Sequence, residues 1–358
     1  MERESTNHQQ TKQRPPLRVA MVTPYYLPTL RGNAMTVHRL LQYIGRRGVE
    51  LKVFSLDALA PESIVTEMTA WQPQLIHAFH GFLGGATARR IAAELKIPFL
   101  ITLTGTDIYE CLNDMRRSET LAAIAEATGV VAFHRSVLEE LAHHDPFQGG
   151  RGLVIPQGVE IPSEPCTGAG GFPFSPGKCT FLLPAGLRPV KNVLFPLLPL
   201  AELFAEDDRL RFLLVGPVLD PSYASQVMSE LTRYPFAHYL GGVGHDSLIC
   251  LYRKADVVLN TSLAEGGMAN TVLEAMACGR PVLAADIAGN RSLVTNGVTG
   301  FLYRDAEEFV QRGRELMHDA ELRLKMGEEG RRLIAEQYAP EKEAAAYWQI
   351  YQRMVSGG

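Results

Sequence analysis

The stretch "SLAEGGMANTVLEAMACGRPVLA" (residues 262–284) combines the features that decide the fold. Two glutamates, Glu265 and Glu274, stand on either side of a double glycine, and an apolar segment closes the stretch. The pattern predicts a helix that begins at about Asn270 and a buried strand after it. A strand, a glycine-containing loop, a helix and a second strand are typical of one unit of a doubly wound α/β sheet.

The same alternation of short apolar runs and amphipathic segments extends over most of the chain. Before the middle of the chain the apolar runs are "LRVAMVTP", "VELKVFSL", "QLIHAFH", "PFLITLTG", "GVVAFH" and "GLVIPQG". After it they are "CTFLLPAG", "RLRFLLVG", "FAHYLGG", "ADVVLNTS", "PVLAADI" and "TGFLYR". Strands that are apolar on both faces and separated by helices predict parallel sheets covered on both sides. We therefore predict two doubly wound α/β domains.

Composition shifts mark the expected boundaries. Residues 1–16 are polar and predict a disordered tail, and residues 161–178 are rich in proline and glycine and predict a linker. The N-terminal domain is expected over 17–160, the C-terminal domain over 179–338, and a final helix over 339–358.

The final helix is predicted from its spacing. In "PEKEAAAYWQIYQRMV", the side chains of Tyr347, Ile350, Tyr351 and Met354 share one helical face, and Trp348 lies on its flank. A surface helix that packs this apolar stripe on a domain is the expected structure.

Composition limits the function classes. The 358-residue chain has a formal net charge of −4, which argues against a general nucleic-acid binder. No run reaches the roughly 18 apolar residues of a membrane span, and the N-terminus lacks the apolar core of a signal peptide. The five cysteines are scattered, and the histidines show no metal-binding spacing, so we expect no metal and a cytoplasmic setting.

Two common nucleotide motifs are missing. "LRVAMVTP" is followed by "YYLPTLRGNAMTV" without the G-x-G-x-x-G of a dinucleotide-binding domain. "GGFPFSPGKCT" has the wrong spacing for a P-loop and is interpreted as linker.

A pair of cations follows a strand in "AGLRPVKNV" (185–193). The strand is expected to end at Gly186, with Arg188 and Lys191 just before a helix. Ligands of open α/β sheets bind beyond the carboxyl ends of strands, and a helix N-terminus with two cations would suit a diphosphate. Two solvated surface cations are the alternative. Gly216 in "LLVGPV" ends another strand, where a glycine allows close backbone approach to a ligand.

The opening stretch offers complementary groups. The amides at Met268, Ala269 and Asn270 would be free at the helix start and could bind an anion or hydroxyl groups. Glu274, one turn into the helix, could accept two ribose hydroxyls, and Glu265 could hold sugar hydroxyls. A glycosidase acid/base pair or a purely structural helix start are the alternatives.

These residues together resemble a known family. "EGGMANTVLEAMACGRPVLA" followed by "AGNRSLVTNGVTGFLY" is similar to the E-G-F-x…L-E-A-M-A-x-G-x-P-V and G-x-x-E…G-x-x-G-F/L-L pattern of retaining glycosyltransferases of the group-1 (family-4) kind. The resemblance covers about residues 17–355. Within the group, "LTGTDIY", "GLRPVKN" and "LVGPVLDP" look most like glycosyltransferase-1-domain-containing proteins and selenosugar synthases.

The resemblance implies a fold and a set of donor-site charges. The fold is GT-B: two Rossmann-like domains facing a cleft, with the last helix crossing back onto the first domain. Arg188 and Lys191 match the pair that grips the donor diphosphate, Glu274 the ribose-binding acid, and Glu265 the acid beside the donor sugar.

The resemblance also implies two loops that hold the donor. The segment Gly267–Asn270 matches the loop whose amides touch the sugar and the phosphate, and Gly32 with Asn33 matches a loop that closes over the donor from the other domain. The full set of implied donor-binding positions outside the charged residues is Gly32, Asn33, Gly186, Gly216, Gly266, Gly267, Met268, Ala269, Asn270 and Thr271.

The implied acceptor side lies in the N-terminal domain. His80, Thr104, Asp107 and Tyr109 occupy its strand ends. The chain departs from the family pattern at several positions. Eight residues instead of seven separate the two glutamates, and Asn33 replaces a glycine. The segment Thr104–Asp107 stands where many relatives have a histidine, and Ser292 stands where the family often has a glutamate.

The expected activity is therefore transfer of a sugar from a nucleotide diphosphate donor, with UDP the commonest carrier in the group, to an acceptor, with the anomeric configuration retained. No metal and no cofactor beyond the donor is implied. The alternatives are a sugar-nucleotide epimerase of the same fold and a non-catalytic nucleotide-sugar-binding protein. No membrane span is expected; peripheral contact with a membrane stays open.

Overall fold

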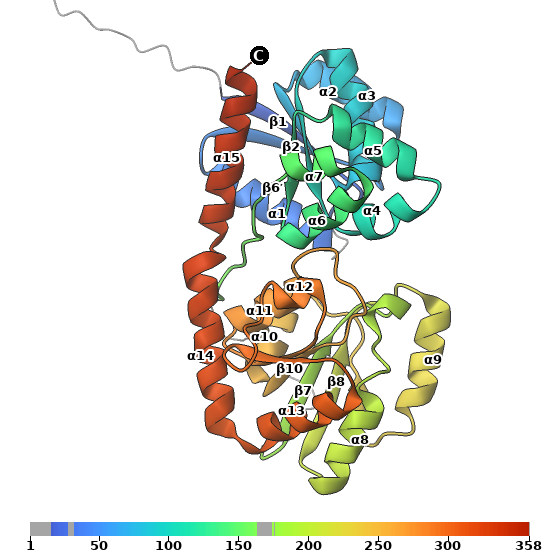
Figure 1. Ribbon diagram of the computed structural model, residues 1–358, viewed down its shortest axis with the longest axis vertical. Coiled ribbons are helices and arrows are strands. Elements are labelled where there is room, and N and C mark those ends of the chain that lie inside the picture. Colours follow the sequence, from blue (N-terminus) through green and yellow to red (C-terminus); the bar gives the residue numbers. More distant parts are fainter. Residues whose placement is uncertain (1–15, 28–31, 163–173, 175, 358) are drawn as a thin grey trace, which may run out of the picture.

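The computed structural model describes residues 16–27, 32–162, 174 and 176–357. Most of the predicted tail and of the predicted linker lies outside these residues. Two α/β bodies stand one above the other in Figure 1, and the last two helices run along one side of both.

The first sheet has six parallel strands in the order β2-β1-β3-β4-β5-β6. Their bounds are β1 Leu17–Thr23, β2 Val49–Ser55, β3 Leu75–Phe79, β4 Phe99–Leu103, β5 Gly129–Ala132 and β6 Leu153–Val154. Val19 of β1 lies between Leu51 of β2 and Leu75 of β3, so the chain order reverses between β1 and β3. Ligands of such sheets bind where the order reverses, at the carboxyl ends of the strands.

The second sheet is also fully parallel, in the order β12-β11-β10-β7-β8-β9. Its strands are β7 Cys179–Pro184, β8 Leu210–Val215, β9 Ala237–Tyr239, β10 Val257–Asn260, β11 Val282–Ala285 and β12 Gly300–Tyr303. Leu182 of β7 lies between Val258 of β10 and Leu213 of β8. This is the strand order of a dinucleotide-binding fold, with its reversal between β7 and β10.

Helices cover both sheets. Those of the first half are α1 Gly32–Gly45, α2 Pro61–Trp71, α3 Gly85–Leu95, α4 Thr106–Tyr109, α5 Arg117–Glu126, α6 Arg135–His144 and α7 Pro146–Arg151. Those of the second half are α8 Leu197–Glu206, α9 Pro221–Leu231, α10 His245–Lys254, α11 Asn270–Ala277, α12 Ala288–Arg291, α13 Ala306–His318 and α14 Ala320–Gln337. Three further short helices are η1 His80–Gly84, η2 Cys111–Asn113 and η3 Pro189–Lys191. The predicted fold class is confirmed.

The last helix, α15 (Pro340–Ser356), packs on the first sheet although it follows the second in the chain (Figure 1). Tyr347, Ile350 and Tyr351 are buried in the same apolar cluster as β1, β3 and α1. Its first turn adds an ion pair, because Arg39 of α1 donates two hydrogen bonds to the buried carboxylate of Glu343. The crossing helix predicted from the family resemblance is therefore present.

A buried polar chain fixes the same helix further along. His77 of β3 bonds the Tyr351 hydroxyl through Nδ1 and the Thr102 hydroxyl through Nε2, both at 2.7 Å. The Thr102 hydroxyl lies 3.0 Å from that of Tyr347. Burial lowers the pKa of His77 from 6.5 to about 3, so the imidazole stays neutral in the folded protein.

This histidine predicts a pH dependence of stability. The unfolded chain binds a proton at His77 below its ordinary pKa of 6.5, whereas the folded chain takes it only near pH 3. The free energy of unfolding should therefore fall as the pH drops below 6.5, by about 1.4 kcal/mol per pH unit from this group alone. Urea unfolding of wild type and His77→Gln between pH 5 and 8 measures it. Below pH 6.5 wild type should lose stability more steeply than His77→Gln, so the difference between the two proteins should change; a constant difference would contradict the assignment.

Candidate functional site

The predicted cations lie at the carboxyl end of β7, next to the point where the strand order reverses. Two details of the prediction were wrong. The strand ends at Pro184 rather than Gly186, and no helix follows the cations directly. Lys191 ends the short turn η3, because Asn192 takes a left-handed conformation with φ 48°, and α8 begins only at Leu197. A helix N-terminus at this site must therefore belong to a helix other than α8.

Lys191 and Glu265 form the centre of the donor-side residues. The ammonium group of Lys191 lies 2.6 Å from Oε1 of Glu265, and the same oxygen accepts from Ser262 Oγ at 2.6 Å and from Asn260 Nδ2 at 3.2 Å. Burial opposes the charge of Glu265, but Lys191 and these hydrogen bonds outweigh it and lower the pKa of the carboxyl group. Glu265 is thus held as a carboxylate beside a cation.

Arg188 differs from Lys191 in having an unpaired atom. Its Nε is buried and has no hydrogen-bond partner among the described residues. A buried unpaired donor is costly in a folded protein, and a bound ligand is one way to satisfy it. Because Lys191 is neutralised by Glu265, Arg188 supplies the positive charge that the described part of the site leaves uncompensated.

Two helix N-termini meet near Glu265, because Asn260 bonds Glu265 and lies 3.5 Å from Thr271 in the first turn of α11. α11 begins at Asn270, as predicted, and α1 begins at Gly32 of the other domain. A Cβ atom on Gly32 would lie 3.4 Å from Nδ2 of Asn270, so the two helix starts are in contact. The first amides of each helix lack an intrahelical partner, and each helix dipole places positive charge there. Their meeting point favours an anion.

The two domains touch through bare backbone at the double glycine. A Cβ atom on Gly105, which has a φ of 108°, would lie 1.8 Å from Cα of Gly266. A Cβ atom on Gly266 would in turn lie 2.3 Å from Cα of Gly105. The predicted donor loop and the predicted acceptor loop are therefore neighbours.

Gly267, the second residue of the double glycine, is buried in the packing of the loop rather than displayed at its surface. A Cβ atom on Gly267 would lie 3.4 Å from the ring of Phe133, which belongs to the first domain. On its other side, the Gly267 carbonyl oxygen lies 2.5 Å from the position of a Cβ on Gly289. A Cβ at residue 267 would thus make an ordinary contact, whereas the close approach of the Gly267 carbonyl restricts residue 289. A contact of Gly267 with the donor stays a prediction.

Glu274 lies one turn into α11, as predicted, and both its oxygens are occupied. Oε1 lies 3.1 Å from Nε2 of His245, and Oε2 accepts from the Tyr252 hydroxyl at 2.9 Å. The hydrogen bond to Glu274 raises the pKa of His245. Burial, followed by the charge of Glu274, raises the pKa of Tyr252, which remains a neutral donor.

Asp107 differs from its predicted role, because its side chain is not displayed for an acceptor. It is fully buried and accepts hydrogen bonds from the amides of Gly81, Thr104 and Gly105. A carboxylate saturated by backbone amides ties two loops together. Asp107 therefore has a structural role: it holds the loops near the contact between the domains.

His80 keeps the features of a site residue. It follows β3, next to the reversal in the first sheet, and has a left-handed backbone with φ 78° in a nearly buried position. Strain of this kind gathers at functional sites. Burial lowers its pKa, against the charge of Asp107. Its Nδ1 accepts the Leu83 amide at 3.2 Å, so the neutral ring bears its proton on Nε2.

The other acceptor-side residues are placed as follows. Thr104 Oγ1 is buried without a partner among the described residues, and the Thr104 carbonyl lies 2.7 Å from the position of a Cβ on Gly266. Tyr109 is half-buried and shares a hydrogen bond with Ser136. Thr104 therefore lies at the domain contact, and Tyr109 lies further along α4.

The remaining predicted donor residues have mixed environments. Met268 and Ala269 are buried anchors of the loop, Thr271 lies 3.5 Å from Asn260 Nδ2, and Asn33 is half-buried in the first turn of α1.

Gly186 and Gly216 have packing reasons of their own. A Cβ on Gly186 would lie 2.6 Å from the side chain of Leu219, and one on Gly216 would lie 2.1 Å from the carbonyl oxygen of Ala185. Gly216 is therefore required by the backbone that follows β7, whether or not a ligand approaches it, whereas at Gly186 the exposed Leu219 side chain could move aside.

Sequence reasoning missed several residues that build the site. Asn260, at the end of β10, bonds Glu265 and receives the side-chain amide of the fully buried Asn290. His245 and Tyr252 bond Glu274. The available signals were a polar residue closing the apolar strand "ADVVLN" and a histidine after the glycines of "GGVGH".

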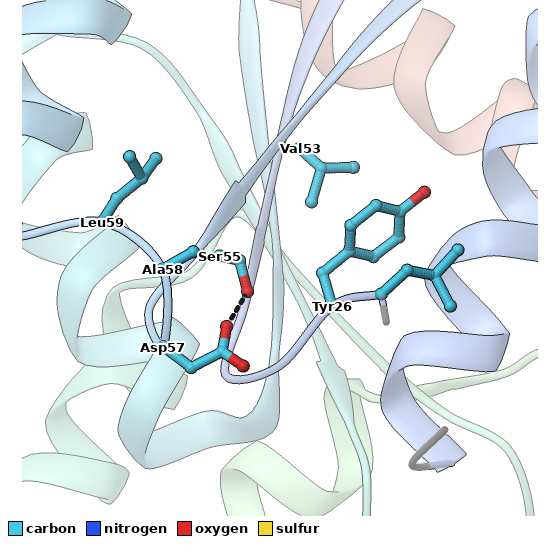
Figure 2. A pocket seen from close by; sticks show the side chains of 7 residues that line it. Tyr26, Val53, Ser55, Asp57, Ala58 and Leu59 are labelled. Atoms are coloured by element: carbon cyan, nitrogen blue, oxygen red, sulfur yellow. Dashed lines mark hydrogen bonds between the residues drawn. The ribbon is translucent and has the colours of Figure 1, made fainter. Parts of the chain in front are cut away.

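A separate hollow of about 440 Å³ lies at the carboxyl ends of β1 and β2 (Figure 2). Its lining residues are Tyr26, Leu27, Val53, Ser55, Asp57, Ala58 and Leu59. Ser55 donates a hydrogen bond to Asp57 across its floor. None of the predicted site residues lines it, and it is one strand removed from the reversal between β1 and β3.

Within the described ranges, no helix is long and apolar enough to cross a membrane. In the same part of the chain, no three or more His, Cys, Asp or Glu side chains gather in a way that could hold a metal ion.

Comparison with known proteins agrees with this geometry. Residues 178–319 match the model of the family "Glycosyl transferases group 1". The chain is 29% identical over 272 residues to glycosyltransferase 1 domain-containing protein 1 of Xenopus tropicalis, covering 73% of this chain and 77% of that protein. It is 25% identical over 283 residues to N-acetyl-alpha-D-glucosaminyl L-malate synthase of Bacillus anthracis, covering 77% and 71%.

A solved structure supports the architecture. Anabaena HepE in complex with UDP and glucose superposes with a TM-score of 0.75 at 18% identity, covering 94% of this chain and 99% of that one. The fold is thus of the GT-B type. The family match lies within the C-terminal domain, and the protein is an enzyme of the glycosyltransferase class.

The glycine contact yields a prediction. In Gly266→Ala the new methyl group meets backbone, at 2.3 Å from Cα of Gly105, so the two loops must separate. A displacement of about 1 Å at a reacting centre costs about 100-fold in rate. Transfer turnover should fall by about that factor, with an unchanged circular dichroism spectrum.

The control is Gly150→Ala, because a Cβ there meets no atom within 4 Å. Wild-type turnover in Gly266→Ala would show that the contact does not position the site.

Proposed function

We propose that the protein transfers a sugar from a nucleotide diphosphate, with UDP as the favoured carrier, to an acceptor bound by the N-terminal domain, and that the anomeric configuration is retained. The observations that support this most are the contact between the α1 and α11 N-termini and the buried Nε of Arg188, three residues before Lys191, which lacks a partner among the described residues. An anion of the size of a diphosphate would satisfy all three groups.

The nucleotide would lie along the carboxyl ends of the second sheet. Glu274 would accept the ribose hydroxyls, and Arg188 with the helix amides would hold the diphosphate. The UDP named in the HepE complex favours UDP as the carrier, and the family-model match over residues 178–319 lies in the domain that contains this sheet. Relatives over most of the chain include a glycosyltransferase 1 domain-containing protein and an N-acetyl-alpha-D-glucosaminyl L-malate synthase, and these names favour transfer over the epimerase alternative.

The chemistry follows from the charges. Negative charge develops on the leaving diphosphate, and groups fixed in advance stabilise it without a metal. Lys191 would contribute through its position between this charge and Glu265, 2.6 Å away. With Glu265 held as a carboxylate beside the donor sugar, positive charge that develops on that sugar would be stabilised. We propose attack from the face that the diphosphate leaves, with the phosphate accepting the acceptor's proton.

The acceptor would bind near His80, Thr104 and Tyr109. The neutral His80 ring would donate from Nε2, and Thr104 Oγ1 would find the partner that it lacks among the described residues. Asp107 would position the loops rather than touch the acceptor. We propose that the reaction takes place in the cytoplasm.

The diphosphate role can be tested by truncation. Arg188→Ala and Lys191→Ala should each lower turnover at least tenfold, and up to about 1,000-fold, because each removes a group that stabilises the leaving diphosphate. Turnover is measured as release of UDP from the UDP-sugar that gives the largest thermal shift. Lys178→Ala is the matched control, because Lys178 pairs with Asp208 before β7, at the other end of the strand. Normal activity of both site variants would reject the role.

The ribose role predicts a binding defect. Glu274→Gln replaces one acceptor oxygen by an amide donor, which cannot accept the second hydroxyl. Calorimetric affinity for UDP should fall by about tenfold or more, since hydrogen bonds to a charged group are strong. An unchanged affinity would remove Glu274 from the donor site.

A further inference from the structure

The Glu274 carboxylate is held by two residues of one helix. His245 and Tyr252 lie seven residues apart on α10, which is two turns, so their side chains leave the same face of the helix. His245 Nε2 lies 3.1 Å from Oε1 of Glu274, and the Tyr252 hydroxyl donates to Oε2 at 2.9 Å. Each oxygen is therefore fixed by its own donor.

The two donors have different surroundings. Tyr252 is fully buried, whereas the His245 side chain is 37% exposed at the first residue of α10. His245 also faces the carboxylates of Asp246 on its own helix and Glu160 in the segment that leaves the first domain. These negative groups favour a proton on the imidazole, so Nε2 remains a donor toward Glu274.

A carboxylate held in this way keeps acceptor capacity. Each oxygen has two lone pairs, and the donors from α10 use one on each. The two that remain form a pair of adjacent acceptors, which matches the two adjacent hydroxyls of a ribose. Side chains that orient a ligand-binding group are as necessary for its geometry as the group itself.

α10 is anchored at its other end as well. Nη2 of Arg253 donates to the carbonyl of Pro162 at 2.5 Å, and the hydroxyl of Tyr43, from α1, donates to Glu160 at 2.9 Å. The helix that holds Glu274 is thus tied to the chain segment between the domains. Its position relative to α11 does not depend on His245 alone.

We propose that His245 is a positioning residue for the nucleotide: together with Tyr252 it orients Glu274 so that the enzyme selects a ribose over a 2′-deoxyribose. This inference rests on the proposed function, because it assumes that Glu274 faces the nucleotide. It adds a residue and a selectivity that the family match does not assign.

The test compares binding of a nucleoside diphosphate and its 2′-deoxy analogue by calorimetry. UDP, ADP and GDP are first compared on the wild-type protein, and the tightest binder and its deoxy analogue are used with His245→Ala, His245→Gln and His143→Ala. His143 is a surface histidine of α6 with a 77% exposed side chain, and serves as the control.

Wild type and His143→Ala should bind the ribonucleotide about tenfold more tightly than the deoxynucleotide, as expected for one hydrogen bond to a carboxylate. In His245→Ala this ratio should fall to about twofold, because Glu274 loses the donor that orients Oε1. His245→Gln keeps an N–H donor on a side chain of similar reach and should restore most of the ratio. A residue that only stabilised the fold would weaken both ligands equally.

The outcomes separate the two proposals. If wild type binds none of the three nucleotides, the proposed function fails and this inference fails with it. If wild type binds but does not discriminate, or if His245→Ala keeps the full ratio, only the inference fails. A ratio lost in His245→Gln as well as in His245→Ala would also overturn it, because the effect would then not come from the Nε2 donor.

Discussion

The backbones of Gly105 and Gly266 touch, and the arrangement of the interdomain site depends on this contact. No side chain fits between the two chain segments, since a Cβ on either residue would lie within 2.3 Å of the other's backbone. Gly105 is held from behind by Asp107, and Gly266 follows Glu265, which is held by Lys191 and Asn260. The contact therefore joins two loops that are each fixed by a buried carboxylate. The strand ends of both domains are brought to one place as a result.

The positive groups of this interdomain site are only partly compensated by negative ones. Lys191 and Glu265 compensate each other, and the hydrogen bonds around Glu265 keep its pKa low despite burial. Among the described residues, Arg188 Nε has no partner and the helix start at Asn270 has no side-chain cap. A preformed positive region of this kind needs no rearrangement when negative charge develops. It is the physical basis on which the donor site of a glycosyltransferase is proposed here.

The helix that closes the chain contributes to the same geometry from outside. α15 follows the second domain but packs on the first, through the Arg39–Glu343 ion pair and the hydrogen-bonded chain around His77. A buried ion pair adds little net stability but is costly to break, so it specifies one docking position. Because α1 also begins with Gly32 at the contact with Asn270, α15 packs on the same helix that meets the start of α11. α15 is thus a second connection between the two domains. The first is the chain segment that contains Gly158, and the amide of Gly158 also donates a hydrogen bond to Glu343.

The sequence by itself determined the two parallel α/β sheets, the helix start at Asn270 and a final helix with Tyr347 and Tyr351 on one face. These features follow from local periodicity, from glycines at loop positions and from strand ends that must share one edge. The tertiary structure alone decided that Asp107 faces inward, that η3 rather than a helix bears Lys191, that Gly267 packs against Phe133, and that His245 reaches Glu274. Each of these depends on which distant backbone or side-chain group comes into contact. The sequence shows which residues can donate or accept hydrogen bonds and which are small. Only the tertiary structure shows which of these residues are in contact.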